Sequence, residues 1–366
     1  MPKPLFPVLK LPNVVIDQLV KHWDMENVID ATMRSDKFFG EVEKFKIVIK
    51  SLTWLVGETL VGIDLDLGSC IVQIRFVKMA ETTGVKKVDG VYVYSTKGPR
   101  IPNANKEDHI LWTFNVDQNK LEDKLVRAEQ VTKHLLKILK PEEFHFQCGL
   151  NNATILPDLF IWNHRKNFST ILVKRSDRRS TTMSPEALIF LMEELKADYR
   201  DLKIRMNAFQ YYKPIQAKTL TLEDMSWVTT ICLMGPQLVK ARSVGRSTAH
   251  IDFNEIITNW VNGGSPNLER LVLDTSTLGL DAAAVYKDLK MEPSIFTKCD
   301  MTRRLCDFTE DCQDVRRLSD GRLATLHSNV DRKLEMTVWH KKHLMFLSPA
   351  TYYKLKSTHG GYFPKK

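Results

Sequence analysis

Short apolar runs alternate with amphipathic helical segments between residues 144 and 274, and this alternation constrains the fold more than any other feature of the chain. Runs of four to eight apolar-rich residues bounded by polar, Gly or Pro residues are typical of strands. We therefore expect strands at 144–148, 170–173, 202–206, 220–222 and 268–273, with a further strand near Leu238. The strands near Leu202, Leu220 and Leu271 are predicted to lie side by side in one sheet.

Two of these runs share one spacing. Leu268-x-x-Leu271-x-Leu273 and Tyr199-x-x-Leu202-x-Ile204 both have the strand register of leucine-rich repeats. The interval between successive strands is irregular, at roughly 16 to 32 residues, where true repeats keep a fixed period. We therefore predict an irregular, leucine-rich-repeat-like array of strands and helices.

The helices in this region carry clear end signals. Ser184 followed by Pro185 is typical of a helix start, because serine caps free N–H groups and proline fits the first turn. Asp252 and Glu255 form a second start signal, a capping box. That second helix is expected to end at Gly263, where glycine tolerates the left-handed backbone of a helix terminus.

The flanking regions have a period of two. Residues 45–95 are expected to form antiparallel strands, followed by a helix at 121–139 that Pro141 ends. Near the C-terminus, residues 315–326 read as a hairpin turning at Asp320-Gly321, because Gly supplies the positive φ that such a turn requires. A third strand at 334–339 and a polar tail from Ser357 complete the expectation.

The first forty residues are expected to form two short amphipathic helices. Pro12, Val15 and Leu19 belong to the apolar stripe of the first, and Val28 and Ile29 to that of the second, which begins after Asp24. Two helices of about ten residues cannot build a stable core alone. Their stripes must therefore pack on the rest of the chain or on another protein.

This N-terminal segment resembles an F-box. The resemblance rests on Phe6-Pro7, Leu11-Pro12, the apolar stripe that follows, and Asp24-Met25-Glu26 between the helices. Two later motifs resemble the F-box-associated domain of the large nematode F-box family: one runs from Asn254 through Trp260, Gly263 and Pro266 to Leu271, and the other contains Arg316, Arg317, Asp320 and Gly321. The three motifs come in the family's order.

The resemblance implies a role in ubiquitination. An F-box binds a Skp-family adaptor and, through it, a cullin, while the associated domain holds a target protein. The residues it assigns to the adaptor are Leu11, Pro12, Val15, Ile16, Leu19, Met25, Val28 and Ile29. The residues of the two later motifs are expected to be structural. Catalysis would belong to the partners, so no catalytic residue and no cofactor is expected in this chain.

Composition excludes other classes. The net charge is +9, but lysines and arginines are spread along the chain, and the one dense cluster, 174–179, lacks interleaved aromatic residues, so nucleic acid is not the expected partner. No stretch approaches the ~20 apolar residues of a membrane span. Six scattered cysteines are typical of a reducing compartment, and we expect a cytoplasmic or nuclear protein.

Three sets of residues could bind a metal or another ligand. Asp64 and Asp66 form a D-x-D pair, which can hold a metal, but they alternate with Ile63 and Leu65 and so read as the outward face of a strand. Three late cysteines, Cys299, Cys306 and Cys312, with His340 and His343 nearby, lack the short paired spacing of a zinc site. The two adjacent arginines and Asp320 read as a brace of the hairpin, with a binding role as the alternative.

The expected fold class is mixed α+β and α/β: a small helical F-box followed by the irregular strand-helix array and a C-terminal β-hairpin region. The expected divisions are 1–44 (F-box), 45–140 (strands and a linking helix), 141–276 (associated domain), 277–350 (hairpin region) and 351–366 (tail). The expected function is substrate recognition in an SCF-type ubiquitin ligase. The alternatives are an α/β protein-interaction module unconnected with ubiquitin, a nucleic-acid binder and, last, an enzyme.

Overall fold

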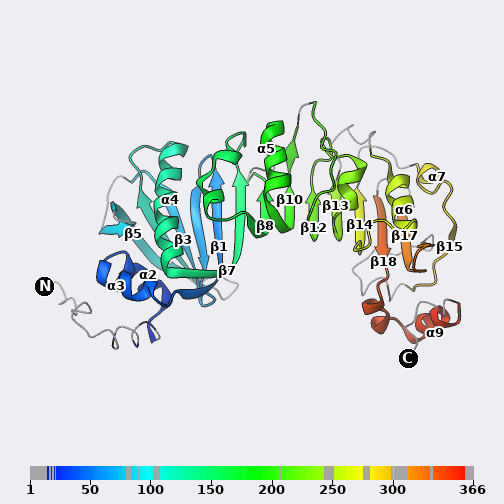
Figure 1. Cartoon of the computed structure of the whole chain (residues 1–366), viewed down its shortest axis with the longest axis horizontal. Coiled ribbons are helices and arrows are strands. Elements are labelled where there is room, and N and C mark those ends of the chain that lie inside the picture. The colour runs from blue at the N-terminus through cyan, green and yellow to red at the C-terminus, as the bar shows by residue number, and fades with distance from the viewer. Residues whose placement is uncertain are drawn as a thin grey trace. The chain divides into compact units, whose positions relative to one another are not determined.

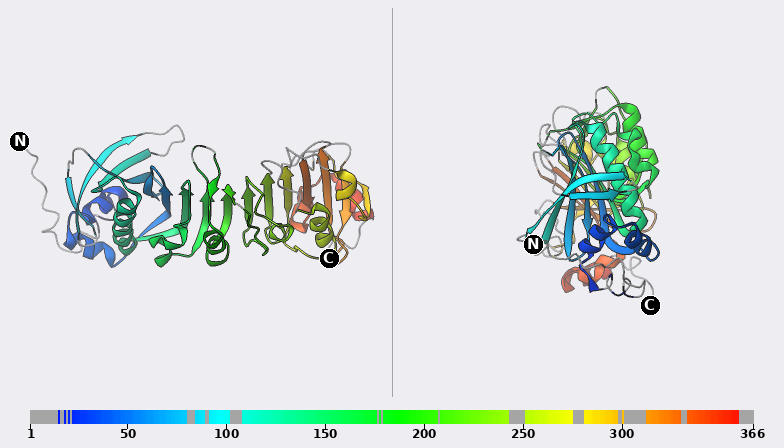
Figure 2. Two further views of the ribbon diagram at one scale, coloured as in Figure 1. Left: turned by 90° about the horizontal axis from the view of Figure 1, so that it is seen from above. Right: turned by 90° about the vertical axis from the view of Figure 1, so that its left-hand side faces the viewer.

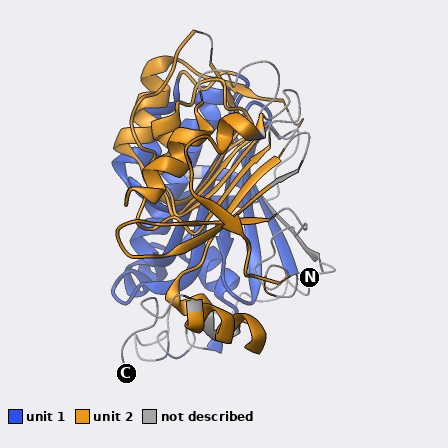
Figure 3. Ribbon diagram, turned by 90° about the vertical axis from the view of Figure 1, so that its right-hand side faces the viewer, with its two compact units in different colours: residues 1–151, 155–171 blue, residues 152–154, 172–366 orange. Residues whose placement is uncertain are grey.

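The computed structural model divides the chain into two compact units (Figure 3). Unit 1 consists of residues 1–151 and 155–171, and unit 2 of residues 152–154 and 172–366. The structure describes residues 15, 18, 20, 22–79, 84–88, 91–101, 108–175, 177, 179–206, 208–242, 251–274, 281–297, 300, 312–329 and 333–358. The predicted class is confirmed in its coarse form, since strands and helices mix and the sheets dominate.

Unit 1 is a mixed sheet with a long helix and two short N-terminal helices (Figure 1). Its strands lie in the order β4-β5-β6-β3-β2-β1-β7-β8. The elements are α2 (Met25–Thr32), α3 (Asp36–Glu43), β1 (Ile47–Gly57), β2 (Val61–Asp66), β3 (Cys70–Val77), β4 (Gly84–Val88), β5 (Val91–Ile101), β6 (Asp108–Asn115), α4 (Leu121–Ile138), β7 (Leu139–Gly149), η2 (Leu156–Asp158), η3 (Phe160–Asn163) and β8 (Asn167–Val173), whose residues up to Ile171 belong to this unit.

The expectation of antiparallel strands in this region is only partly right. β1–β2, β2–β3, β4–β5 and β5–β6 are antiparallel, but β1 pairs parallel with β7 and β3 pairs parallel with β6. A parallel pair needs a crossover connection. The predicted helix α4 precedes β7 and packs on the sheet, where Trp54 Nε1 donates to Thr132 Oγ1 at 3.1 Å. α4 therefore belongs to a crossover and not merely to a linking segment.

Unit 2 contains the predicted strand-helix array. β10 (Lys196–Leu202), β12 (Thr219–Leu222), β13 (Leu238–Arg242) and β14 (Arg270–Asp274) pair parallel in this order. The strands near Leu202, Leu220 and Leu271 thus lie in one sheet, which confirms the prediction. The sheet continues antiparallel through β18 (Lys333–Val338), β17 (Leu323–Asn329), β16 (Gln313–Arg316) and β15 (Met291–Pro293), while β9 (Thr181–Thr182) and β11 (Ile204–Arg205) form a separate pair.

One detail of the predicted repeat is wrong. The strand pairing aligns Leu202 with Leu273, so Arg200, and not Leu202, occupies the position of Leu271. Arg200 is fully buried there, and its guanidinium donates to the carbonyls of Leu191, Leu195 and Gln216. An arginine stands where the motif has leucine. Matching leucine to leucine therefore shifted the predicted alignment of this strand by two residues.

Helices cover one face of the parallel strands (Figure 2). They are α5 (Pro185–Ile189), the π-helical turn η4 (Phe190–Glu194), η5 (Thr230–Met234) and α6 (Phe253–Val261), and α7 (Ala282–Val285) follows β14. Both predicted helix starts are confirmed, because Ser184 Oγ accepts from Ala187 N and Asp252 Oδ1 accepts from Glu255 N. The strand residues facing the helices, such as Leu220, are buried.

The C-terminal part of unit 2 ends in η6 (Lys341–Phe346) and α9 (Pro349–Thr358). Residues 351–358, assigned above to a tail, are therefore helical. Leu355 of α9 is fully buried in a cluster with Phe296, Leu323, Trp339 and Leu347. The predicted hairpin is present, with a turn at 318–321 and Gly321 at φ +71°, and the third strand is β18.

Candidate functional site

The predicted adaptor-binding residues fall into three groups. Leu11, Pro12, Ile16 and Leu19 lie outside the described residues. Val15 is 39% exposed, and Met25 is half-buried. Val28 and Ile29 of α2 are 1% and 0% exposed. Their side chains pack against the chain itself, so in this structure they are not available to an adaptor.

The edge strand β4 holds α2 in place. Lys86 Nζ, on a side chain only 2% exposed, forms an ion pair with Asp30 Oδ1 at 2.8 Å and lies 4.3 Å from the ring centroid of Trp112. Lys87 N donates to Met33 O at 2.7 Å, at the end of α2. This bond satisfies a backbone group on a strand that would otherwise present an open edge.

The Asp30 carboxylate is held in its charged form. Burial would raise the pKa of Asp30, but the charges and hydrogen bonds of Lys86 and Arg34 outweigh it and hold that pKa below its usual range. The buried lysine and the half-buried aspartate therefore depend on each other, because either charge left alone would be costly to bury. α2 is in this way an integral part of unit 1.

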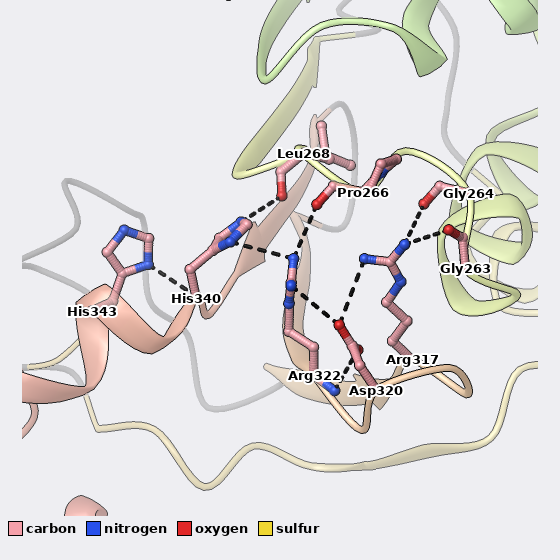
Figure 4. Close-up of polar contacts among 9 residues, drawn as sticks. All are labelled: Gly263, Gly264, Pro266, Leu268, Arg317, Asp320, Arg322, His340 and His343. Atoms are coloured by element: carbon pink, nitrogen blue, oxygen red, sulfur yellow. Dashed lines mark hydrogen bonds and ion pairs between the residues drawn. The ribbon is translucent and has the colours of Figure 1, made fainter. Parts of the chain in front are cut away.

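The two later sequence motifs meet in unit 2 (Figure 4). Arg317 follows β16, and its Nη2 donates to the carbonyls of Gly263 and, at 3.1 Å, Gly264, which lie just after α6. Its guanidinium carbon lies 5.7 Å from the ring centroid of the fully buried Trp260. Arg317 therefore caps the end of α6 from more than fifty residues away, a job that a bidentate guanidinium does well.

The hairpin turn contributes a second arginine. Asp320 accepts from the Arg322 backbone N–H at 3.1 Å and pairs with the Arg322 guanidinium at 3.1 Å, with Arg317 Nη1 4.0 Å away. Arg322 Nη1 donates to Pro266 O at 3.0 Å and lies 3.3 Å from His340 Nδ1. The turn is thus tied to the segment after α6 (Figure 4). We call this set of residues, Trp260, Gly263, Gly264, Pro266, Arg317, Asp320, Arg322 and His340, the brace.

Within the brace, His340 connects Arg322 to Leu268, which lies just before β14. A guanidinium can only donate, so His340 Nδ1 must accept from Arg322, which leaves the proton on Nε2 to donate to Leu268 O at 2.9 Å. Burial lowers the pKa of His340; the Leu268 carbonyl opposes this shift, and the nearby positive charge of Arg322 reinforces it. The imidazole is therefore neutral in the brace.

The remaining motif residues are also structural. Asn254, in α6, donates from Nδ2 to Val285 O and Lys287 O at 2.9 and 2.8 Å. These bonds join α6 to the end of α7 and the residues that follow it. Gly263 has φ +103°, which side chains rarely adopt, and Leu271 is fully buried on β14. Arg316, in contrast to Arg317, is exposed. The contacts of the brace side chains are mainly with backbone carbonyls.

Sequence reasoning missed several members of these networks. Gly264, Arg322 and Lys86 of the α2 contact were not singled out, and His340 was considered only as a possible metal ligand. Arg322 follows the Asp-Gly turn directly, and that position was the one available signal. The partners of Lys86 are 56 and 26 residues away along the chain, and no local pattern predicts such contacts.

The D-x-D pair lies where the alternation placed it. Ile63 and Leu65 of β2 are fully buried, whereas Asp64 and Asp66 are partly exposed. Asp64 pairs with Arg75 at 2.5 Å, and Asp66 pairs with Lys50 at 2.9 Å. Each carboxylate is thus paired with a positively charged side chain.

The cysteines that the structure describes, Cys70, Cys148, Cys232 and Cys312, are all buried. Burial raises the pKa of Cys148 to about 11, which disfavours the reactive thiolate. Cys299 and Cys306 lie outside the described residues. His343 Nε2, a candidate zinc ligand in the sequence, lies 3.9 Å from Glu269 Oε2.

Wider comparisons complete the description. None of the described helices has the length and apolar character needed to cross a membrane. In the described part of the chain, no group of three or more His, Cys, Asp and Glu side chains is arranged to hold a metal ion. Neither the known protein families, nor the curated proteins, nor the solved structures include a match to this chain.

Proposed function

We propose that this protein is a substrate-recognition subunit of an SCF-type ubiquitin ligase. Its N-terminal segment would bind a Skp-family adaptor, and through it a cullin, while unit 2 would hold a target protein. The chain itself supplies proximity between target and conjugating enzyme, and the partners carry out the chemistry.

The observation that carries the proposal is the brace. The two late motifs that resemble the F-box-associated domain are more than forty residues apart, yet Arg317 of one is bonded to Gly263 and Gly264 of the other. This contact supports their being two parts of one domain, which is what the resemblance implies. Their order after the F-box-like segment adds to that support.

The burial of α2 narrows the proposed adaptor surface. Val28 and Ile29 are buried inside unit 1, so we leave them out of the proposed adaptor-binding surface. The proposed surface consists of the first helix and the start of the second: Leu11, Pro12, Val15, Ile16, Leu19 and Met25. Val15, which is 39% exposed, is the best position for a test, because its replacement leaves the core intact.

The test is a pull-down of purified Skp-family adaptor by the full chain. Wild type is expected to bind, whereas Leu11→Ala/Pro12→Ala and Val15→Asp are expected to lose binding, because few buried apolar anchors dominate such contacts. Val126→Asp is the matched control, since Val126 lies on α4 of the same unit and is 58% exposed. Folded wild type that fails to bind, or Val15→Asp that binds as well as Val126→Asp, rejects the proposal.

A second candidate is a protein-interaction module with no connection to ubiquitin. The specific observation in its favour is the attachment of α2 to β4 through Lys86 and Lys87, because a helix packed in its own domain needs no adaptor. On this alternative, the first helix also packs on unit 1 and binds no adaptor. Adaptor binding by wild type that Val15→Asp abolishes would exclude it.

A further inference from the structure

Among the described residues of unit 2, the helices lie on one face of the parallel strands, and the other face carries none of them (Figure 2). On β13, Val239 and Ala241 point to the helical layer and are buried, whereas Leu238, Lys240 and Arg242 are exposed. The neighbouring strand β12 follows the same alternation, with Thr219 and Thr221 partly exposed. We call this surface of β10, β12, β13 and β14 the open face.

Nearly all charge on the open face and at its strand ends is already compensated. The ion pairs are Lys174–Asp201 at 2.6 Å, Lys203–Glu223 at 2.5 Å, Arg242–Asp274 at 3.6 Å and Arg270–Glu335 at 2.7 Å. Each of these carboxylates therefore has a base beside it, and none offers an unmatched negative charge to a partner.

Lys240 is different. It lies in the middle of the open face, because β13 is paired on both sides, and its neighbours across the strands are Thr221 and Val272. Neither can neutralise it, and no acidic side chain of the described residues pairs with it. An exposed lysine flanked by threonine and valine leaves the centre of the face positive.

We propose that the open face binds an acidic segment of a target protein, with Lys240 as the central contact. Lys240 places at the centre of the surface a positive charge that no acidic side chain of the described residues pairs with, and the neighbouring Thr219 and Thr221 are partly exposed. Charge complementarity governs specificity and association more than raw affinity. This inference rests on the proposed function, because it names the kind of target that unit 2 would hold.

A protein segment fits this surface better than a nucleic acid. Single strands need aromatic side chains on which bases stack. Tyr199, which is half-buried, is the aromatic residue that the described strands place on the open face. Leu238, which is 36% exposed, instead offers an apolar contact to a peptide side chain.

The experiment measures the fluorescence anisotropy of a labelled twelve-residue glutamate-rich peptide titrated with the full chain at low salt. Saturable binding that weakens as salt rises is expected, because exposed charges are screened. A Gly/Ser peptide of the same length should not bind. No adaptor is present, so a negative result here leaves the adaptor proposal untouched.

Two variants locate the contact. Lys240→Glu should weaken binding at least about fivefold, through a lost attraction and a new repulsion. Thr221→Glu keeps the lysine but gives it an internal partner across the strands, and should weaken binding to a similar degree. Lys290→Glu makes the same charge change at an exposed lysine outside the open face and should leave binding within about twofold.

A carbodiimide, which joins carboxylates directly to lysine amines, should link the peptide to Lys240. The proposal is overturned when Lys290→Glu loses as much affinity as Lys240→Glu, or when the cross-links map elsewhere. A twelve-nucleotide single-stranded DNA that binds more tightly than the peptide, in a manner dependent on Lys240, would also overturn it in favour of nucleic acid.

Discussion

Single arginines hold backbone together in this protein. Arg200 and Arg317 are both buried, and both donate to main-chain carbonyls. Desolvation lowers the pKa of Arg200 to about 10, so even there the guanidinium is charged at neutral pH. At this scale the structure uses a planar, permanently charged donor as a backbone connector, a role that lysine cannot copy.

Replacing Arg317 should show that geometry matters as much as charge. Arg317→Lys is expected to destabilise unit 2 by roughly 1–3 kcal/mol, because lysine keeps the charge but loses the planar guanidinium, which contacts the carbonyls of Gly263 and Gly264 through Nη2 and faces Asp320 through Nη1. Arg316→Lys is the matched control, since Arg316 is adjacent and exposed. Urea unfolding of the full chain measures both, and equal effects would contradict the assigned role.

His340 should make unit 2 sensitive to acid. Its pKa is lowered in the folded state, so the unfolded chain takes up the proton first as the pH falls. The stability it contributes is therefore complete above the unfolded pKa of about 6.5 and is lost as the pH falls through the lower, folded value. His340→Gln should reduce the stability difference between pH 7.5 and pH 5, measured by urea unfolding.

The exposed His22→Gln serves as the control for the loss of a histidine. A pH dependence that His340→Gln leaves unchanged would mean that the brace does not sense the imidazole charge.

Helix α2 and strand β4 depend on each other at the scale of elements. The two helices at the N-terminus are too short to be stable alone, and β4 forms the edge of its sheet. The contact through Lys86, Lys87 and Asp30 solves both problems. The helical caps in unit 2 act differently, because Ser184 and Asp252 stabilise their helices locally.

Breaking the Lys86–Asp30 pair should release α2. Lys86→Met leaves the Asp30 carboxylate partly buried without its main partner, and we expect a loss of roughly 3 kcal/mol or more in unit 1, as for other buried pairs that lose one member. The double variant Lys86→Met/Asp30→Asn should recover part of that loss, since no charge is then stranded. Urea unfolding and limited proteolysis near α2 measure the effect; additive losses would argue against coupling.

The whole molecule consists of two units with cores of their own. Unit 2 is completed by its last helix, because Leu355 of α9 joins Phe296, Leu323 and Trp339, and the rings of Phe296 and Trp339 stack with centroids 3.8 Å apart. A segment that looks like a tail in the sequence therefore closes the end of this core.

Truncating this contact should weaken unit 2 alone. Leu355→Ala is expected to cost about 2–4 kcal/mol, through lost burial and the cavity left behind. Tyr353→Ala on the same helix should change stability by less than about 0.5 kcal/mol, since Tyr353 is 68% exposed. Hydrogen exchange of the full chain, resolved by peptide, would show whether protection falls within unit 2, as expected, or in unit 1 as well.

The sequence by itself determined the features that neighbouring residues control. Helix starts at Ser184 and Asp252, the turn at Gly321 and the outward position of Asp64 follow from hydrogen bonds and backbone preferences within a few residues. The membership of the array strands in one sheet also followed, since each apolar run needs a buried face.

Tertiary structure alone decided the rest. Arg200 occupies a leucine position because carbonyls of a π-helical turn lie above it, and α2 is buried because Lys86 of β4 reaches Asp30. Arg317 was predicted to brace its own hairpin; it does pair with Asp320 of the turn, and it also bonds the end of α6. These contacts join residues far apart along the chain, and their energies depend on burial, which no local sequence pattern specifies.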